Sequence, residues 1–186
     1  MAIQLIFLAC AVLTPITILA EAGLIATWNR WYFTRGVMVL RWGVPADHTP
    51  PTRSIDGALN NRARSPGITT SLVFTPFNDS TYGFRERILP VRPLMYTPVM
   101  RGLLILDPAN GQVVVKGFLY WSLIPLTLAL ATSSLLPNPV APPIFVVGLL
   151  MVVAIIYLFQ ALRFVGVARD AAYVWSLSAT NEGPAS

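Results

Sequence analysis

The chain has 186 residues, of which 55% are hydrophobic and 11% are charged, with a formal net charge of +5 and a mean hydropathy of +0.63. Soluble domains carry about 25% charged residues, so this composition excludes a disordered tail, a disulfide-stapled miniprotein and a typical cytosolic enzyme. Because a core of this size cannot hold all of the apolar residues, we expect an integral membrane protein.

Residues 1–26 are predicted to form the first transmembrane helix. The apolar run from Ile3 to Ala26 is interrupted only by Gln4, Pro15 and Glu21. It reaches the length of about 20 residues that a bilayer-spanning helix needs. No Lys or Arg precedes the run, and the run is longer than the hydrophobic part of a usual signal peptide, so an uncleaved anchor is expected.

Glu21 is the most informative single residue of this first segment. An ionisable group inside a spanning helix is rare and suggests a functional site by default, here a proton-carrying group or a contact to a partner. Glu21 nevertheless lies five residues before Ala26, near the end of the helix. There it could reach lipid headgroups or Arg30, or form an ion pair with another subunit. The sequence favours this second interpretation over the first.

Residues 27–117 are predicted to form a basic, β-rich domain. Eleven of the thirteen Lys and Arg residues and five acidic residues lie here, which gives a net charge of +6 (eleven minus five). Short β-prone runs alternate with Gly, Pro, Asn and Asp, a pattern typical of a small antiparallel sheet. The best hairpin joins its last two strands through a turn at 107–111, where Asn110-Gly111 tolerates positive φ. The candidate strands are 36–42, 68–75, 81–88, 100–106 and 112–117.

Two connectors in this domain are expected to be irregular, because both are rich in proline: 44–66 and 89–98. Arg85 and Arg87 fall on one face of the candidate strand 81–88. They could contact anionic lipid. The solvated face of a half-buried sheet is the alternative, and the one we favour.

Residues 118–163 are predicted to form a transmembrane helical hairpin. Its second helix runs from Phe118 to about Leu136 and its third from about Pro143 to Leu162, and the proline-rich stretch 136–142 makes the turn. The remaining residues, 164–186, are expected to form a cytoplasmic tail that lies along the membrane interface as a short amphipathic segment containing Trp175.

The basic residues predict the orientation of the chain. Every Lys and Arg lies in 27–117 or at Arg163 and Arg169. By the positive-inside rule the large loop and the C-terminus are then cytoplasmic and the N-terminus is outside. Trp28, Trp31 and Trp121 fall at the same interface, as an aromatic belt requires. A single lysine against twelve arginines suggests a high-GC bacterial genome, and therefore a bacterial inner membrane.

Catalytic and metal-binding patterns are missing from the sequence. His48 is the only histidine and Cys10 the only cysteine, and no Gly-rich phosphate loop or serine nucleophile motif occurs. We therefore predict no catalytic, cofactor-binding or metal-binding residue and no cofactor. Nucleic acid is not an expected partner, because the arginines are spread through the loop and are explained by topology.

The sequence thus predicts an α+β membrane protein with three transmembrane helices and a small antiparallel β-rich cytoplasmic domain inserted between the first two. Its expected role is that of a non-enzymatic accessory or scaffolding subunit of a larger membrane complex, for instance a bioenergetic one, with other integral membrane subunits and lipids as partners. The alternative is a membrane-tethered module whose basic domain recognises anionic lipid or a peptide. An enzyme is the third hypothesis, since residues from different loops can form a catalytic site that matches no sequence motif. The candidate partner or lipid contacts are Glu21, Trp28, Arg30, Trp31, Arg85, Arg87, Lys116, Trp121, Arg163 and Trp175.

Overall fold

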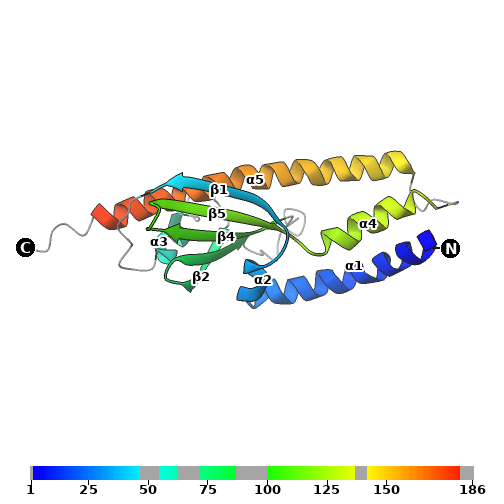
Figure 1. Cartoon of the computed structure of the whole chain (residues 1–186), viewed down its shortest axis with the longest axis horizontal. Helices are drawn as coiled ribbons and strands as arrows, with labels where there is room; N and C mark the ends of the chain where they lie inside the picture. Colours follow the sequence, from blue (N-terminus) through cyan, green and yellow to red (C-terminus); the bar gives the residue numbers. More distant parts are fainter. Residues whose placement is uncertain (1, 47–54, 63–71, 87–99, 137–141, 181–186) are drawn as a thin grey trace, which may run out of the picture.

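The computed structural model describes residues 2–46, 55–62, 72–86, 100–136 and 142–180. Within these ranges the chain is an α+β protein with one antiparallel sheet, as the sequence predicts. Three apolar helical stretches extend from one end of the sheet, and the N-terminus lies at the far end of them (Figure 1). They are α1 (Ala2–Ala26), α4 (Leu123–Ser133) and the first half of α5 (Pro143–Thr180).

Two of these helices are long and apolar enough to cross a membrane, α1 and α5. The third, α4, has 11 residues, which at 1.5 Å per residue gives about 17 Å against a hydrocarbon core of about 30 Å. The expectation of three helices of full spanning length is therefore not confirmed. Phe118 and Leu119, which the sequence placed in the second helix, instead end strand β5. Pro125 lies in the first turn of α4. The N–H groups of a first turn have no acceptor within the helix, so a proline there costs no helical hydrogen bond.

In the described part of the chain the sheet has five strands in the order β1-β5-β4-β3-β2, and every neighbouring pair is antiparallel. Each candidate strand of the sequence overlaps one of them, and the bounds that fall on described residues differ by up to three residues. Residues 68–71 and 87–88 of the candidate strands lie outside the described ranges. The hairpin between the last two is confirmed, with Asp107 opposite Gln112 and Gly111 at a φ of +57°. The strands are β1 (Met38–Pro45), β2 (Leu72–Asn78), β3 (Thr81–Glu86), β4 (Met100–Asp107) and β5 (Gln112–Leu119).

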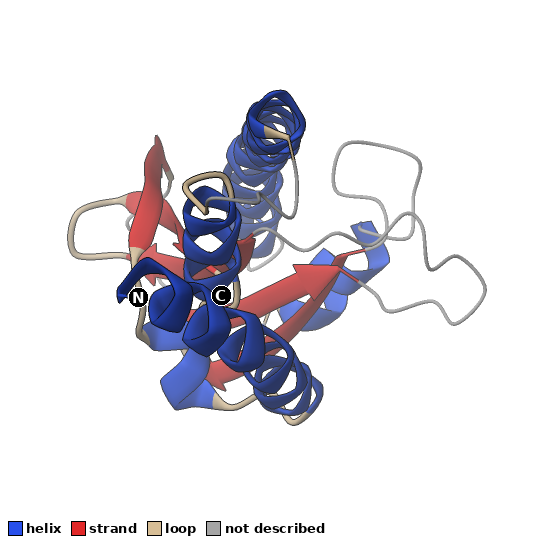
Figure 2. Cartoon of the chain, turned by 90° about the vertical axis from the view of Figure 1, so that its right-hand side faces the viewer, coloured by secondary structure: helices blue, strands red, loops and turns tan. Residues whose placement is uncertain are grey.

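Helix α5 leaves the apolar bundle without a break and covers one face of the sheet. The sequence placed an interfacial tail after residue 163, but the helix continues to Thr180. The reason is a stripe of side chains at helical spacing, Phe164, Val167, Ala168, Ala171 and Trp175, all of which are buried in the core against the sheet. With 38 residues, α5 is about 57 Å long. Both views place its first half to one side of α1 and α4 (Figure 1 and Figure 2).

A short helix, α3 (Asp56–Arg62), lies within the stretch expected to be irregular. Ile55 and Leu59, four residues apart, are both buried in the core between the sheet and α5. The amide side chain of Asn60 bonds both the N–H and the C=O of Phe74, at 2.9 and 3.0 Å. It thereby occupies backbone groups of edge strand β2 that could otherwise pair with another chain. The connector 89–98 lies outside the described residues.

Candidate functional site

The candidate site forms where the chain turns back after α1. Trp28 takes a φ of +52°, and Asn29 then caps the short helix α2 (Arg30–Thr34) by accepting a hydrogen bond from the N–H of Tyr32 at 3.2 Å. This reversal returns Tyr32 to the side of α1. Its hydroxyl donates to the carboxylate of Glu21 at 2.6 Å.

Glu21 is buried, with 3% of its surface exposed. Besides Tyr32, its carboxylate accepts hydrogen bonds from the N–H of Trp121, from the N–H of Ser122 at 3.0 Å and from the hydroxyl of Ser122. These two residues directly precede α4, whose N-cap residue, Ser122, makes no capping bond of its own. Unpaired N–H groups and the helix dipole both favour an anion at this position. Glu21 of α1 therefore caps α4.

Arg101 of β4 supplies the opposite charge and is completely buried. Its Nη1 lies 3.9 Å from Oε1 of Glu21, and its guanidinium carbon lies 3.7 Å from the centre of the Tyr32 ring. Nη1 also donates to the carbonyl of Leu119 at 3.0 Å, and Nη2 donates to the carbonyl of Arg35. Arg101 thus joins the end of α2 to the end of β5. Among the described residues, its Nε has no hydrogen-bond partner.

Burial shapes the electrostatics of this group of residues. Desolvation, together with the hydrogen bond to Glu21, raises the pKa of Tyr32 well above its usual value, so its hydroxyl keeps its proton and remains a donor. Desolvation lowers the pKa of Arg101, and the neighbouring Tyr32 and Glu21 oppose this effect. An arginine keeps its charge inside proteins, so the cluster contains an ion pair away from water.

We call Glu21, Tyr32, Arg101, Trp121 and Ser122 the Glu21–Arg101 cluster. Its two charged groups and its phenol are 3% exposed or less. Apart from Nε of Arg101, their polar atoms bond one another and backbone groups at the ends of α2 and β5 and at the start of α4. This arrangement is suited to holding elements together. Among the described residues, no group of three or more His, Cys, Asp or Glu side chains could hold a metal ion.

The structure brings several of the predicted contact residues to this junction. Trp31 packs edge-on against Trp121, with 5.4 Å between ring centres. Arg85 lies over the ring of Trp28 at 4.6 Å. Arg30 begins α2 at this junction, but its side chain is exposed. Lys116 and Arg163 are half-buried on the sheet and on α5, and Trp175 is completely buried in the sheet core. Arg87 lies outside the described residues.

Sequence reasoning missed Tyr32, Arg101 and Ser122. It offered Arg30 as a partner for Glu21, whereas the ion pair forms with Arg101, 80 positions further along the chain. One signal was available, because Arg101 opens the otherwise apolar run RGLLIL and a charge within such a strand needs a partner. Nothing local in the sequence says which acid that partner is.

Gly36 gives a direct test of how tightly the cluster is packed. It has a φ of +138°, and a Cβ there would overlap Nη2 of Arg101 and lie 3.2 Å from Nε1 of Trp121. We expect Gly36→Ala to cost about 3 kcal/mol from backbone strain and displacement of Arg101, which lowers Tm in mild detergent by about 9 °C. Gly23→Ala is the control, since no atom lies within 4 Å of a Cβ at Gly23. Equal Tm values for the two variants would contradict the packing described.

Comparison with protein-family models, with curated proteins and with solved structures finds no match for this chain.

Proposed function

We propose that this protein is a non-enzymatic accessory or scaffolding subunit of a larger membrane protein complex. In this proposal the chain crosses a bacterial inner membrane three times, with the N-terminus outside and the sheet in the cytoplasm. All thirteen Lys and Arg residues lie in the sheet-forming half of the chain or in the second half of α5, and this supports the orientation through the positive-inside rule.

The path of the chain supports the third crossing even though α4 is short. Strand β5 ends where the sheet meets the apolar helices, whereas α5 begins at the opposite end of these helices (Figure 1). If α5 crosses the membrane, the residues between Leu119 and Pro143 must cross it as well. The turns at 121–122 and 134–136 extend this crossing beyond the about 17 Å of α4 itself, and α4 packs along α1.

The observation that carries the proposal is the exposed apolar surface on the first half of α5. From Ile144 to Phe159, the only buried residue is Val146. α1 and α4 pack on each other, but the first half of α5 has few contacts with either. The second half, by contrast, is fixed in the core of the sheet domain. A helix that is anchored at one end and unpacked in its apolar half offers a long surface to the helices of another subunit.

Purification of the tagged full-length protein from its native membrane in a gentle detergent tests this proposal. We expect other integral membrane chains to co-elute in fixed stoichiometry, identified by mass spectrometry. A monodisperse monomer without a stable partner would remove the main support.

Gly148 allows the test to be directed at α5 itself. A Cβ at this position meets no atom within 4 Å, so Gly148→Leu is expected to leave the fold intact. Small residues let membrane helices approach closely, and a leucine would keep a partner helix away. We expect the co-eluting chain to be lost from Gly148→Leu and retained in Met151→Leu, a volume-conserving change at a 61% exposed position of the same helix. Retention by both variants would place the partner elsewhere.

The basic charge of the sheet domain favours the second candidate, a membrane-tethered module that binds anionic lipid or a peptide. The fold determines how this candidate can be tested. Residues 27–117 alone lack Phe164, Val167 and Trp175, which complete the core of the sheet. Binding must therefore be measured with the full chain and not with the excised loop.

A further inference from the structure

The chain exposes apolar side chains beside the apolar helices where it enters β1. Val37, Met38 and Val39 are 51%, 49% and 36% exposed. Met38 pairs with Phe118, and the register then shifts at Val39, whose carbonyl accepts a hydrogen bond from the hydroxyl of Tyr157 at 3.0 Å. This bond ties the start of β1 to α5. The exposed apolar surface of the sheet is therefore continuous with that of the helix.

Helix geometry sets the depth of this end of the sheet. From Ile144, a hydrocarbon core of about 30 Å takes about 20 helical residues and ends at Arg163. The exposed apolar side chains of α5 continue to the same point, with Leu162 59% exposed. From Tyr157 to Arg163 the helix rises about 9 Å, and from Val39 to Trp42 the strand rises about 10 Å. β1 and α5 run alongside each other (Figure 1). These rises therefore bring Trp42 to about the level of Arg163.

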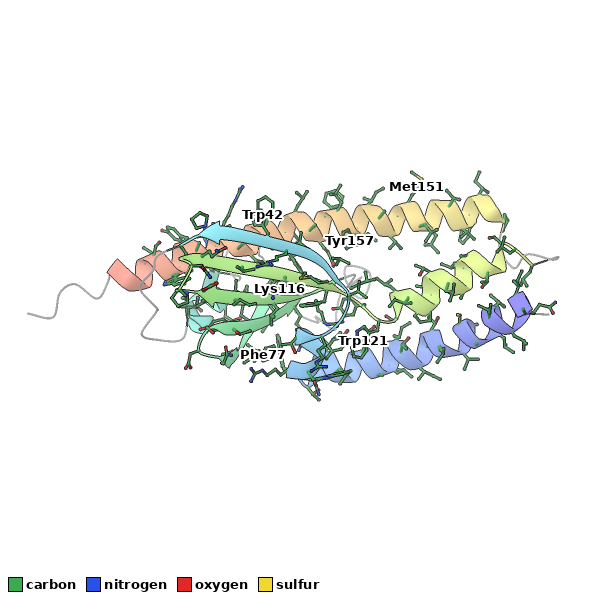
Figure 3. All side chains as sticks on the ribbon, in the orientation of Figure 1. Trp42, Phe77, Lys116, Trp121, Met151 and Tyr157 are labelled. Carbon is green, nitrogen blue, oxygen red and sulfur yellow. The ribbon has the colours of Figure 1, made fainter. Side chains whose placement is uncertain are left out.

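Two cations lie at this same level. Arg41 of β1 is directly opposite Lys116 of β5, on the sheet face opposite to the one that packs on α5. In Figure 3, Lys116 and Trp42 lie at similar positions along the long axis, further from the helical end than Tyr157. Like charges directly opposite each other are destabilising, and neither cation has an ion-pair partner in the described part of the chain. Within the ranges that the structure describes, no carboxylate neutralises this pair.

We propose that the end of the sheet near the helices is sunk into the lipid headgroup layer, where Arg41 and Lys116 bind the phosphate of an anionic phospholipid. Val37, Met38 and Val39 then contact acyl chains, and Trp42 lies at the interface, where tryptophan is enriched. The continuous apolar surface favours lipid over a soluble acidic protein. This inference rests on the membrane insertion proposed above.

Depth is tested with spin labels on the full chain in vesicles of phosphatidylglycerol and phosphatidylcholine. In a Cys10→Ala background, labels at Met38→Cys, Met151→Cys and Asn110→Cys are compared by their accessibility to oxygen and to a water-soluble nickel chelate. Met151 is exposed on the first half of α5, and Asn110 is exposed in the distal turn. We expect Met38→Cys to be protected from nickel nearly as well as Met151→Cys. Accessibility equal to that of Asn110→Cys would overturn the proposal.

Lipid binding is tested with the double variant R41Q/K116Q, by native mass spectrometry of phosphatidylglycerol retained in a neutral detergent. Each basic residue near the surface contributes about fivefold, so we expect binding to weaken by about 25-fold. The matched control is R169Q, an exposed charge on the second half of α5. The proposal would be overturned if wild type and R41Q/K116Q retained phosphatidylglycerol equally. It would also be overturned if R41Q/K116Q lost a co-eluting protein and not the lipid. Release of the protein from vesicles by alkaline carbonate would instead refute membrane insertion itself.

Discussion

Replacing Glu21 with alanine is expected to lower the free energy of unfolding by about 3–5 kcal/mol, because it leaves the completely buried Arg101 without its counter-charge. It also removes the acceptor for the N–H groups of Trp121 and Ser122 at the start of α4. For a chain of this size the change corresponds to a fall in Tm of about 6–20 °C. Thermal unfolding in mild detergent, followed by far-ultraviolet circular dichroism, measures it.

The double variant E21A/R101M separates the ion pair from its surroundings. If the cost of Glu21→Ala comes from a stranded charge, removing that charge as well should recover part of the stability, and the two single changes will not add. Strict additivity would contradict the coupling.

Glu21→Gln should leave membrane insertion intact, because Glu21 acts through hydrogen bonds and an ion pair to other elements of the fold. Loss of activity or of a partner in that variant, with stability retained, would instead support a direct functional role.

Replacing Trp175 with alanine is expected to cost about 3–5 kcal/mol, because this side chain is completely buried between α5 and the sheet. The matched control is Tyr173→Ala, two residues earlier on the same helix, where the ring is 55% exposed. It loses the cation–π contact with Arg62 at 5.9 Å, worth about 1 kcal/mol or less at an exposed site. The same unfolding experiment compares the two. A Trp175→Ala variant as stable as Tyr173→Ala would mean that the second half of α5 does not dock on the sheet in solution.

Local patterns were enough to predict the class of the fold and all five strands. Short β-prone runs bounded by Gly, Pro and Asn reveal strands because the signal is contained in a few neighbouring residues. The end of the third helix was misjudged because Arg163 closes the apolar run and so resembles the end of a membrane span. The residues after it repeat at helical spacing, from Phe164 to Trp175. That period predicts a helix but not the surface that it covers, which depends on the whole sheet.

The candidate site shows more clearly that local sequence does not identify contacts between distant residues. Glu21 could be singled out because one carboxylate in an apolar segment is conspicuous by itself. Its partner could not be identified, since Arg101 reaches it only after the chain reverses at Trp28 and the sheet assembles. The cap on α4 was hidden for a similar reason. A helix is usually capped by a neighbouring residue, whereas this cap comes from another helix 100 positions away.

In a bilayer, the unbroken α5 makes the sheet sensitive to the thickness of the membrane. Spanning helices respond to hydrophobic mismatch by changing their tilt. No hinge separates the apolar half of α5 from the half that is fixed in the sheet core, so any change of tilt must also rotate the sheet. The Glu21–Arg101 cluster attaches the same sheet to α1 and α4 at a second point. A thinner or thicker bilayer would thus be converted into a different orientation of the domain relative to the membrane plane.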